Sequence, residues 1–303
     1  MPHEAQGTAL LRGAIDCHVH CAPHLNGRTV NVFDAVRQAA AAGMRAIGIM
    51  CNFQNTSGFA ALANEELGHL GCEAFGGVIM QPTAGGVTLE VAKAAIGYGY
   101  GPGTGAKFVS LPTHHTRYIA EREGRSPTFL ETTFSVPSNG KIPDPVPAIL
   151  DLCAERDVVF DCGHVSAPEC VALAEEAKKR GVKRLRTHGS RYPLDAIAEI
   201  TALGGYVELT FFILTHATQV GLTHVDEEKH KINGSTTIQD FAPRMRAAGE
   251  RCILSSDAGV YLLPPPVEAF RQYLMLTQSE GFSDAELRRM SRDNPAALFG
   301  IAL

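Results

Sequence analysis

Two histidines near the start of the chain, His18 and His20, are the residues whose types and spacing point most directly to chemistry. They end the apolar run 14–20, which has the pattern of a β-strand. Because side chains alternate across a strand, both imidazoles are expected on one side, about 6–7 Å apart along the chain. An apolar strand gains nothing from burying two imidazoles without partners, whereas one metal ion can bind both. The spacing therefore predicts a metal site at the end of this strand.

Three later apolar runs also end in side chains that bind metals, which are His164, His188 and Asp257. Imidazole and carboxylate groups are ligands that zinc and manganese accept. A single histidine at a strand end carries little information, but four strand ends of this kind in one chain favour a shared site. We expect one or two divalent ions, with zinc ahead of manganese.

The composition indicates a folded globular protein. The chain has 303 residues, of which 45% are hydrophobic and 19% charged, and its net charge of −5 provides no basic surface for nucleic acid or an anionic membrane. We find neither an export signal nor an apolar run near the roughly 18 residues of a membrane span. The eight cysteines form no CxxC pair and are expected to be reduced. These features predict a cytoplasmic protein with a small-molecule substrate and no nucleic-acid or membrane partner.

Short apolar strands alternate with helical patterns along the whole chain, as in parallel βα units. The strands are expected near 14–20, 45–51, 73–80, 106–111, 157–162, 184–188, 205–210 and 252–256. The helices are expected at 32–42, 57–69, 87–97, 145–156, 167–180, 194–203, 237–248 and 266–279. This order predicts a single (β/α)8 TIM-like barrel domain over residues 1–303. Catalytic groups of such barrels lie at the C-terminal ends of the strands, where all the candidate ligands fall.

Two long segments interrupt the alternation. Residues 112–142 follow the fourth strand and residues 211–235 follow the seventh. Long loops at the catalytic face of a barrel are usually lids or substrate-binding segments, although a plain surface insertion is the simpler alternative. Residues 283–303 are expected to form a terminal helix that packs on the barrel.

With these residues placed, the chain resembles the amidohydrolase superfamily of metal-dependent hydrolases. The similarity covers nearly the whole length: the HxH motif of the first strand, a histidine after the fifth and after the sixth strand, an aspartate after the eighth, and a closing segment at 294–300. Residues 163–166 and 254–257 are similar to a poorly characterised branch of these hydrolases. The resemblance implies a metal-dependent barrel enzyme.

One departure from the superfamily concerns the number of metals. Members that bind two ions often carry a carboxylated lysine or a glutamate at the end of the fourth strand, whereas Lys107 lies near the start of that strand here. A single ion is therefore the simplest expectation, with Glu208, or else His114 or His115, as an additional ligand. Glu208 lies in an apolar strand, where a structural hydrogen bond to a neighbouring strand is an equally good interpretation.

The resemblance also implies roles for the site residues. A bound divalent ion lowers the pKa of water from about 15.7 towards 7. Asp257 would take the proton of the attacking water and pass it to the leaving group. His188 would orient or polarise the substrate carbonyl. Asp16, two residues before His18, is a candidate partner for a ligand or a purely structural carboxylate.

Substrate-binding residues are sought around the same strand ends. We expect His114, His115, Arg191 and Tyr261 to contact the substrate, and Arg191 could bind a carboxylate through two hydrogen bonds. The sequence does not choose among an amide, a cyclic amide, a lactone and an ester of a small organic molecule. A homo-oligomer is expected by analogy alone.

Other functions remain open at this point. A metal-dependent decarboxylase or hydratase of a small carboxylic acid would use the same ligands, and release of carbon dioxide without hydrolysis would identify it. A phosphoesterase is disfavoured because no second cluster of His and Asp follows the early strands. A non-catalytic metal-binding barrel is disfavoured because the ligand set is complete.

Overall fold

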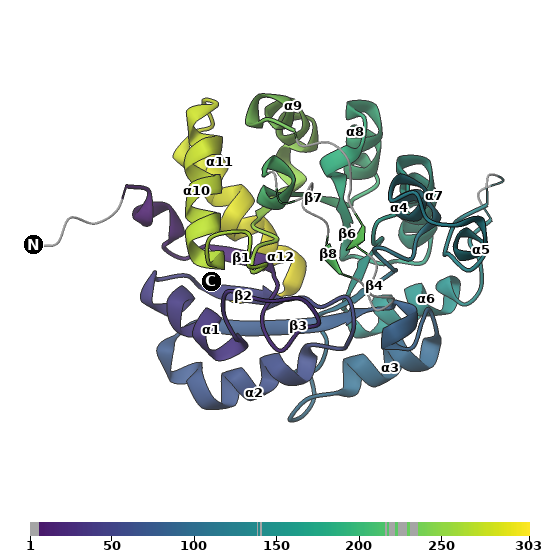
Figure 1. Ribbon diagram of the computed structural model, residues 1–303, viewed down its shortest axis with the longest axis horizontal. Helices are drawn as coiled ribbons and strands as arrows, with labels where there is room; N and C mark the ends of the chain where they lie inside the picture. The colour runs from purple at the N-terminus through teal and green to yellow at the C-terminus, as the bar shows by residue number, and fades with distance from the viewer. Residues whose placement is uncertain are drawn as a thin grey trace, which may run out of the picture.

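The computed structural model describes residues 6–137, 139, 141–215, 217, 222–223, 229–230 and 236–303. Its centre is one sheet of eight parallel strands in chain order, ringed by helices (Figure 1). The strands are β1 (Ile15–Val19), β2 (Ala46–Ile49), β3 (Glu73–Ile79), β4 (Phe108–Ser110), β5 (Val159–Asp161), β6 (Leu185–His188), β7 (Tyr206–Thr210) and β10 (Cys252–Ser255). The predicted (β/α)8 barrel is confirmed.

The sheet closes into a barrel at the ends of its first and last strands. A parallel bridge joins Val19 to Ala258, and the backbone N–H of His20 donates a hydrogen bond to the Ala258 carbonyl at 2.8 Å. Gly259 makes this approach feasible, because its φ is 120° and a Cβ there would lie 1.8 Å from the His20 carbonyl oxygen. The seam that closes the barrel is therefore also the place where the HxH motif lies.

Helices follow the strands as the alternation predicts. They are α1 (Val32–Ala41), α2 (Ser57–Leu67), α3 (Leu89–Gly97), α6 (Val146–Arg156), α7 (Ala167–Lys179), α8 (Leu194–Ala202), α9 (Ile238–Ala248) and α10 (Pro266–Ser279). Side chains cap several of them: Asn31 accepts the N–H of Asp34 at the start of α1, and Thr237 and Asp240 form a capping box on α9. Every predicted strand and helix of the barrel is present, with ends that differ by at most two residues.

The core has two layers. Strand side chains that point outward pack with the helices, whereas the barrel interior holds a smaller apolar cluster that includes Ile15, Phe75 and Phe108. The chain ends in α11 (Asp284–Arg288), a π-helical segment (Arg289–Asp293) and α12 (Asn294–Phe299). Phe299 packs into the inner cluster against Phe75, with ring centroids 4.6 Å apart. The predicted terminal helix therefore seals the interior rather than only covering the outside.

Both predicted insertions are present. The first contains two short helices, α4 (Arg117–Arg122) and α5 (Pro127–Leu130), which the sequence pattern did not predict because each has fewer than two turns. The second contains two antiparallel strands, β8 (Leu222–Thr223) and β9 (Lys229–His230), and most of its other residues lie outside the described ones. Among the helices that the structure describes, none has the length and apolar character that a membrane crossing requires.

Candidate active site

A β-bulge in β1 aims the first histidine into the barrel. The step from Asp16 to Val19 spans three residues, whereas the facing step in β2 spans two, so one residue is extra. Cys17 packs in the inner cluster, and simple alternation would turn His18 outward. The bulge lets both side chains point inward. Asp16 binds backbone groups at this point: its Oδ1 accepts the backbone N–H groups of His18, at 3.3 Å, and of Ser256, at 2.9 Å, which fits the structural alternative given above.

Three predicted ligands meet at the seam of the barrel. His18 Nε2 lies 3.3 Å from Asp257 Oδ1, and His20 Nε2 lies 3.2 Å from the same oxygen. We call these three residues the ligand triad. Their ligand atoms lie within 4.8 Å of one another. Asp257 has a φ of 51°, which is rare outside glycine, and its N–H donates to the His18 carbonyl at 2.9 Å. Barrel closure therefore holds a strained residue with its carboxylate between the two imidazoles.

The protonation states of His20 and Asp257 suit a divalent ion. Burial lowers the pKa of His20 to about 4, so its ring is neutral at pH 7. Burial alone would raise the pKa of Asp257, but His18 and His20 hold it below its usual range, so the carboxylate is ionised. Two imidazoles and an ionised carboxylate form a ligand set of the kind that zinc binds. The residues present therefore fit a divalent ion.

Four charged side chains of β5, β6 and β7 fill the barrel interior next to the triad. We call Asp161, Arg186, His188 and Glu208 the ion-pair layer. Arg186 Nε donates to Asp161 Oδ2 at 2.7 Å, and Arg186 Nη1 lies 3.4 Å from Glu208 Oε2. The guanidinium also lies 5.4 Å from the ring centroid of Phe108. Burial opposes ionisation of both carboxyl groups, but Arg186 and His188 hold the pKa of each below its usual range.

Glu208 connects the ion-pair layer to the triad. Its Oε1 lies 3.2 Å from His18 Nδ1 and also accepts the hydroxyl of Ser255. Since Nδ1 of His18 is held in this way, the Nε2 atom faces Asp257. The contact fits a carboxylate that orients a metal-binding histidine. Glu208 also forms a second group of ligand-type atoms with His18 and His188.

His188 lies between two carboxylates. Its Nε2 is 3.2 Å from Asp161 Oδ2 and its Nδ1 is 2.9 Å from Glu208 Oε2. Burial would lower the pKa of His188, but Asp161 and Glu208 raise it to about 10, so the ring is an imidazolium at pH 7. In this arrangement both nitrogens face carboxylates, and His188 places its positive charge in the wall of the pocket described next.

A pocket opens above the triad at the C-terminal ends of the strands. Its walls include polar side chains from several loops, which are Asn26, Arg28, Asn52, Thr113, His114, Tyr118, His164, Ser190 and Arg191. Apolar side chains such as Phe53, Ile119, Phe212 and Val260 complete it. His164 is half-buried, its buried Nδ1 has no hydrogen-bond partner, and desolvation holds its pKa well below the usual value. It therefore offers a neutral imidazole to this pocket.

The other predicted substrate-binding residues lie at different places. His114 and Arg191 line the pocket, and His114 Nδ1 lies 2.6 Å from Glu123 Oε1. His115 Nε2 instead lies 3.0 Å from the Thr132 carbonyl within the insertion, and His115 is not among the pocket residues. Tyr261 is 58% exposed and lies outside the pocket wall as well. These two predicted residues therefore lie apart from the pocket above the triad.

Sequence reasoning missed four residues around the site. The sequence carried a signal for Asp161 and Arg186, because a charged residue within an apolar strand indicates the side of the strand that faces a polar interior. Arg186 lies on the same side of its strand as His188. His24 and Arg28 lie in the irregular loop after β1, where no periodic pattern predicts orientation.

Comparisons with known proteins agree with this fold. A model described as "Family of unknown function (DUF6282)" matches residues 13–208. No curated protein matches the chain.

An amidohydrolase from Pseudomonas aeruginosa has 13% identity and a TM-score of 0.58, over 97% of this chain and 98% of that one. An organophosphorus hydrolase from Deinococcus radiodurans has 16% identity and a TM-score of 0.55, over 97% and 94%. An organophosphate hydrolase engineered from a weak promiscuous lactonase has 16% identity and a TM-score of 0.56, over 98% of each chain. The resemblance to the amidohydrolase superfamily is thus confirmed as a likeness of fold.

Proposed function

We propose that this chain, which belongs to the DUF6282 family of unknown function, is a single-domain, metal-dependent hydrolase of a small organic molecule. The observation that carries the proposal is the ligand triad, in which two imidazole nitrogens lie 3.2 and 3.3 Å from one carboxylate oxygen. The triad lies at the end of a barrel where catalytic groups of this architecture gather, and a pocket opens above it.

The triad would hold one ion, with zinc ahead of manganese, and His164, whose Nδ1 has no hydrogen-bond partner, is a further candidate. A divalent ion supplies Lewis acidity, which polarises a carbonyl or phosphoryl oxygen and lowers the pKa of water. Asp257 is ionised and lies in the pocket wall, so it can accept a proton from water and return it to the leaving group. His188 presents a fixed positive charge to the same space, where it would stabilise negative charge on a substrate oxygen.

The bond cleaved is proposed to be an ester, a lactone or an amide. The structural neighbours are named for hydrolysis, and they include a lactonase-derived enzyme and an amidohydrolase. The site adds an independent reason, since a ligand triad that includes the carboxylate of Asp257, together with the imidazolium of His188, supplies groups that acyl transfer to water can use.

The test is a hydrolysis assay on protein reconstituted with one equivalent of zinc or manganese. The substrates are p-nitrophenyl esters, γ- and δ-lactones and anilides, and turnover is expected to depend on the metal. Asp257→Asn should lower kcat by about 10²–10⁴-fold, whereas the exposed matched variant Asp34→Asn should not. Carbon dioxide release from carboxylic acids without hydrolysis would favour the decarboxylase instead. Binding of metal with neither reaction would favour the non-catalytic barrel.

A further inference from the structure

Two arginines of the pocket wall, Arg28 and Arg191, lack an acidic partner. Most buried or half-buried arginines of this chain are paired: Arg186 with Asp161 and Glu208, for example, and Arg45 with Glu73. Among the described residues, no carboxylate lies at ion-pair distance from either Arg28 or Arg191. Both side chains nevertheless line the pocket above the triad.

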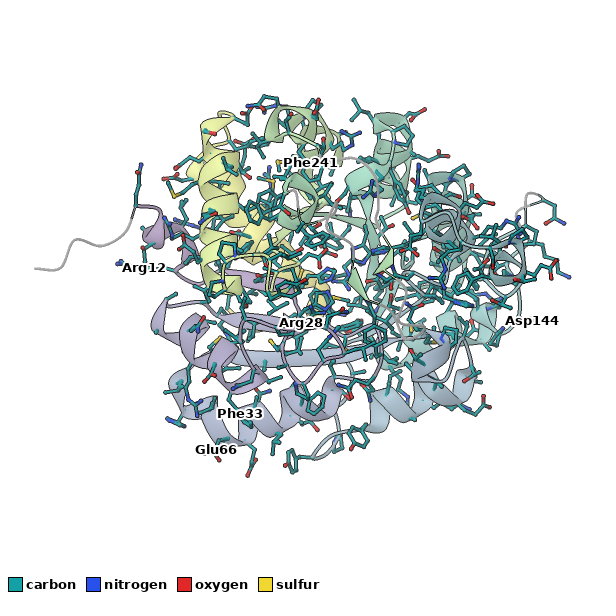
Figure 2. The ribbon with its side chains drawn as sticks, in the orientation of Figure 1. Arg12, Arg28, Phe33, Glu66, Asp144 and Phe241 are labelled. Atoms are coloured by element: carbon teal, nitrogen blue, oxygen red, sulfur yellow. The ribbon has the colours of Figure 1, made fainter. Side chains whose placement is uncertain are left out.

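Arg28 is held by weak or neutral contacts. Its Nη1 donates to the Gly27 carbonyl at 3.3 Å, and its Nη2 lies 2.7 Å from His24 Nε2. Its Nε is buried without a hydrogen-bond partner. The residue lies near the centre of the view in Figure 2, where the loop after β1 crosses the barrel. Burial lowers the pKa of Arg28 to about 10, which leaves it charged at pH 7 but poorly solvated.

Arg191, on another wall of the pocket, likewise has a buried nitrogen without a hydrogen-bond partner among the described residues. It ends the short 3-10 helix that follows β6, and its Nη2 is buried without a hydrogen-bond partner. Tyr118, from α4 in the first insertion, lies in the same wall and accepts a hydrogen bond from Arg122 at 2.9 Å. The hydroxyl proton of Tyr118 is therefore free to be donated, so this wall offers donors and positive charge to an anion.

The described pocket wall pairs neither cation with a carboxylate, although Asp257 attracts Arg28 from beyond ion-pair distance. Asp257 is the only carboxylate in the described pocket wall, and its oxygen is engaged by His18 and His20. A desolvated guanidinium without a partner is costly. An anionic ligand removes this cost at each arginine, and a guanidinium matches a carboxylate with two parallel hydrogen bonds.

We propose that the substrate is a small organic acid with two carboxylates, one bound by Arg28 and the other by Arg191, on either side of the bond to be cleaved. The two residues follow β1 and β6, which are separated around the barrel by β7 and β10, so they approach the pocket from different sides. The identity of the cleaved bond rests on the proposed function, whereas the binding of the dianion does not.

The test measures binding without turnover. Calorimetric titrations compare glutarate and isophthalate with their monoamides, glutaramate and isophthalamate, on protein with zinc and on chelated protein. The wild type should bind each dicarboxylate at least about tenfold more tightly than its monoamide. Arg28→Met and Arg191→Met should each remove most of this preference, in both metal states. The control Arg117→Met, an exposed arginine of α4 paired with Glu121, should retain it.

The outcomes separate this proposal from the proposed function. Equal affinity for dicarboxylates and monoamides, or a preference unchanged by Arg28→Met and Arg191→Met, would overturn the dianion site even in an active hydrolase. An arginine-dependent preference in protein that hydrolyses nothing would support the dianion site and contradict only the hydrolase.

Discussion

The charged side chains of the ion-pair layer are paired with one another, whereas two arginines of the pocket above it are not paired with a carboxylate within the described part of the chain. In the layer, Arg186 lies between Asp161 and Glu208, and His188 contacts both carboxylates. In the pocket, Arg28 and Arg191 contact no carboxylate of the described residues. Side chains that neutralise one another hold a structure, whereas side chains left unneutralised in a cavity are available to a ligand.

The ion-pair layer positions the ligand triad, whereas the pocket is proposed to bind the substrate, although the residues of both come from neighbouring strands. The layer fixes the ring of His18 through Glu208, so it acts on the ligand triad from below. The pocket acts on the substrate from above. The following predictions each change one side of this comparison.

Loss of the cation in the layer should have the largest effect on stability. Arg186→Met leaves Asp161 and Glu208 buried without their main counter-charge, which we expect to lower the free energy of unfolding by about 3–5 kcal/mol. Urea unfolding followed by circular dichroism measures the change. Arg45→Met, which breaks a half-exposed pair with Glu73, should cost less than about 1 kcal/mol. Equal losses in the two variants would contradict the structural role of the layer.

The two carboxylates of the layer should differ in their effect on metal binding. Glu208→Gln and Asp161→Asn each remove one buried negative charge beside Arg186 and His188, but only Glu208 contacts His18. Glu208→Gln should weaken zinc affinity by about 10–100-fold, whereas Asp161→Asn should leave it closer to the wild type. Competition with a chromogenic chelator measures both. If Asp161→Asn weakened zinc binding more strongly, Glu208 would not be the residue that orients His18.

A fall in pH should lower the stability of the folded protein through His24. Burial, then His20 and Arg28, lower the pKa of His24 to about 2, so the folded state leaves it neutral while the unfolded chain takes up a proton below about pH 6.5. Because the unfolded state binds more protons there, stability falls as the pH falls. Between pH 6.5 and 5, His24→Gln should reduce this loss by about 1–2 kcal/mol. Parallel curves for variant and wild type would argue against a neutral His24.

The smallest effect on stability is expected from the unpaired arginines themselves. Arg28→Met and Arg191→Met remove charges with no acidic partner. Each should therefore lower or raise the free energy of unfolding by less than about 1 kcal/mol. The same urea experiment measures this. A loss as large as that of Arg186→Met would mean that these residues hold the fold rather than a ligand.

The barrel was predictable because its strands and helices repeat a strong periodic pattern, and strand ends then located His18, His20 and Asp257 together. Alternation alone could not place Asp16, because a one-residue bulge changes the side of the strand without any mark in the sequence. Arg28 escaped prediction for a related reason, since a loop has no period from which to infer direction.

The central claim is that the ligand triad binds one divalent ion, and metal content tests it most directly. The measurement is elemental mass spectrometry on the wild type and on His18→Ala/His20→Ala, both purified without added metal or chelator. We predict about one zinc or manganese per wild-type chain and almost none in the variant. No metal in either protein, or equal metal in both, would contradict the claim.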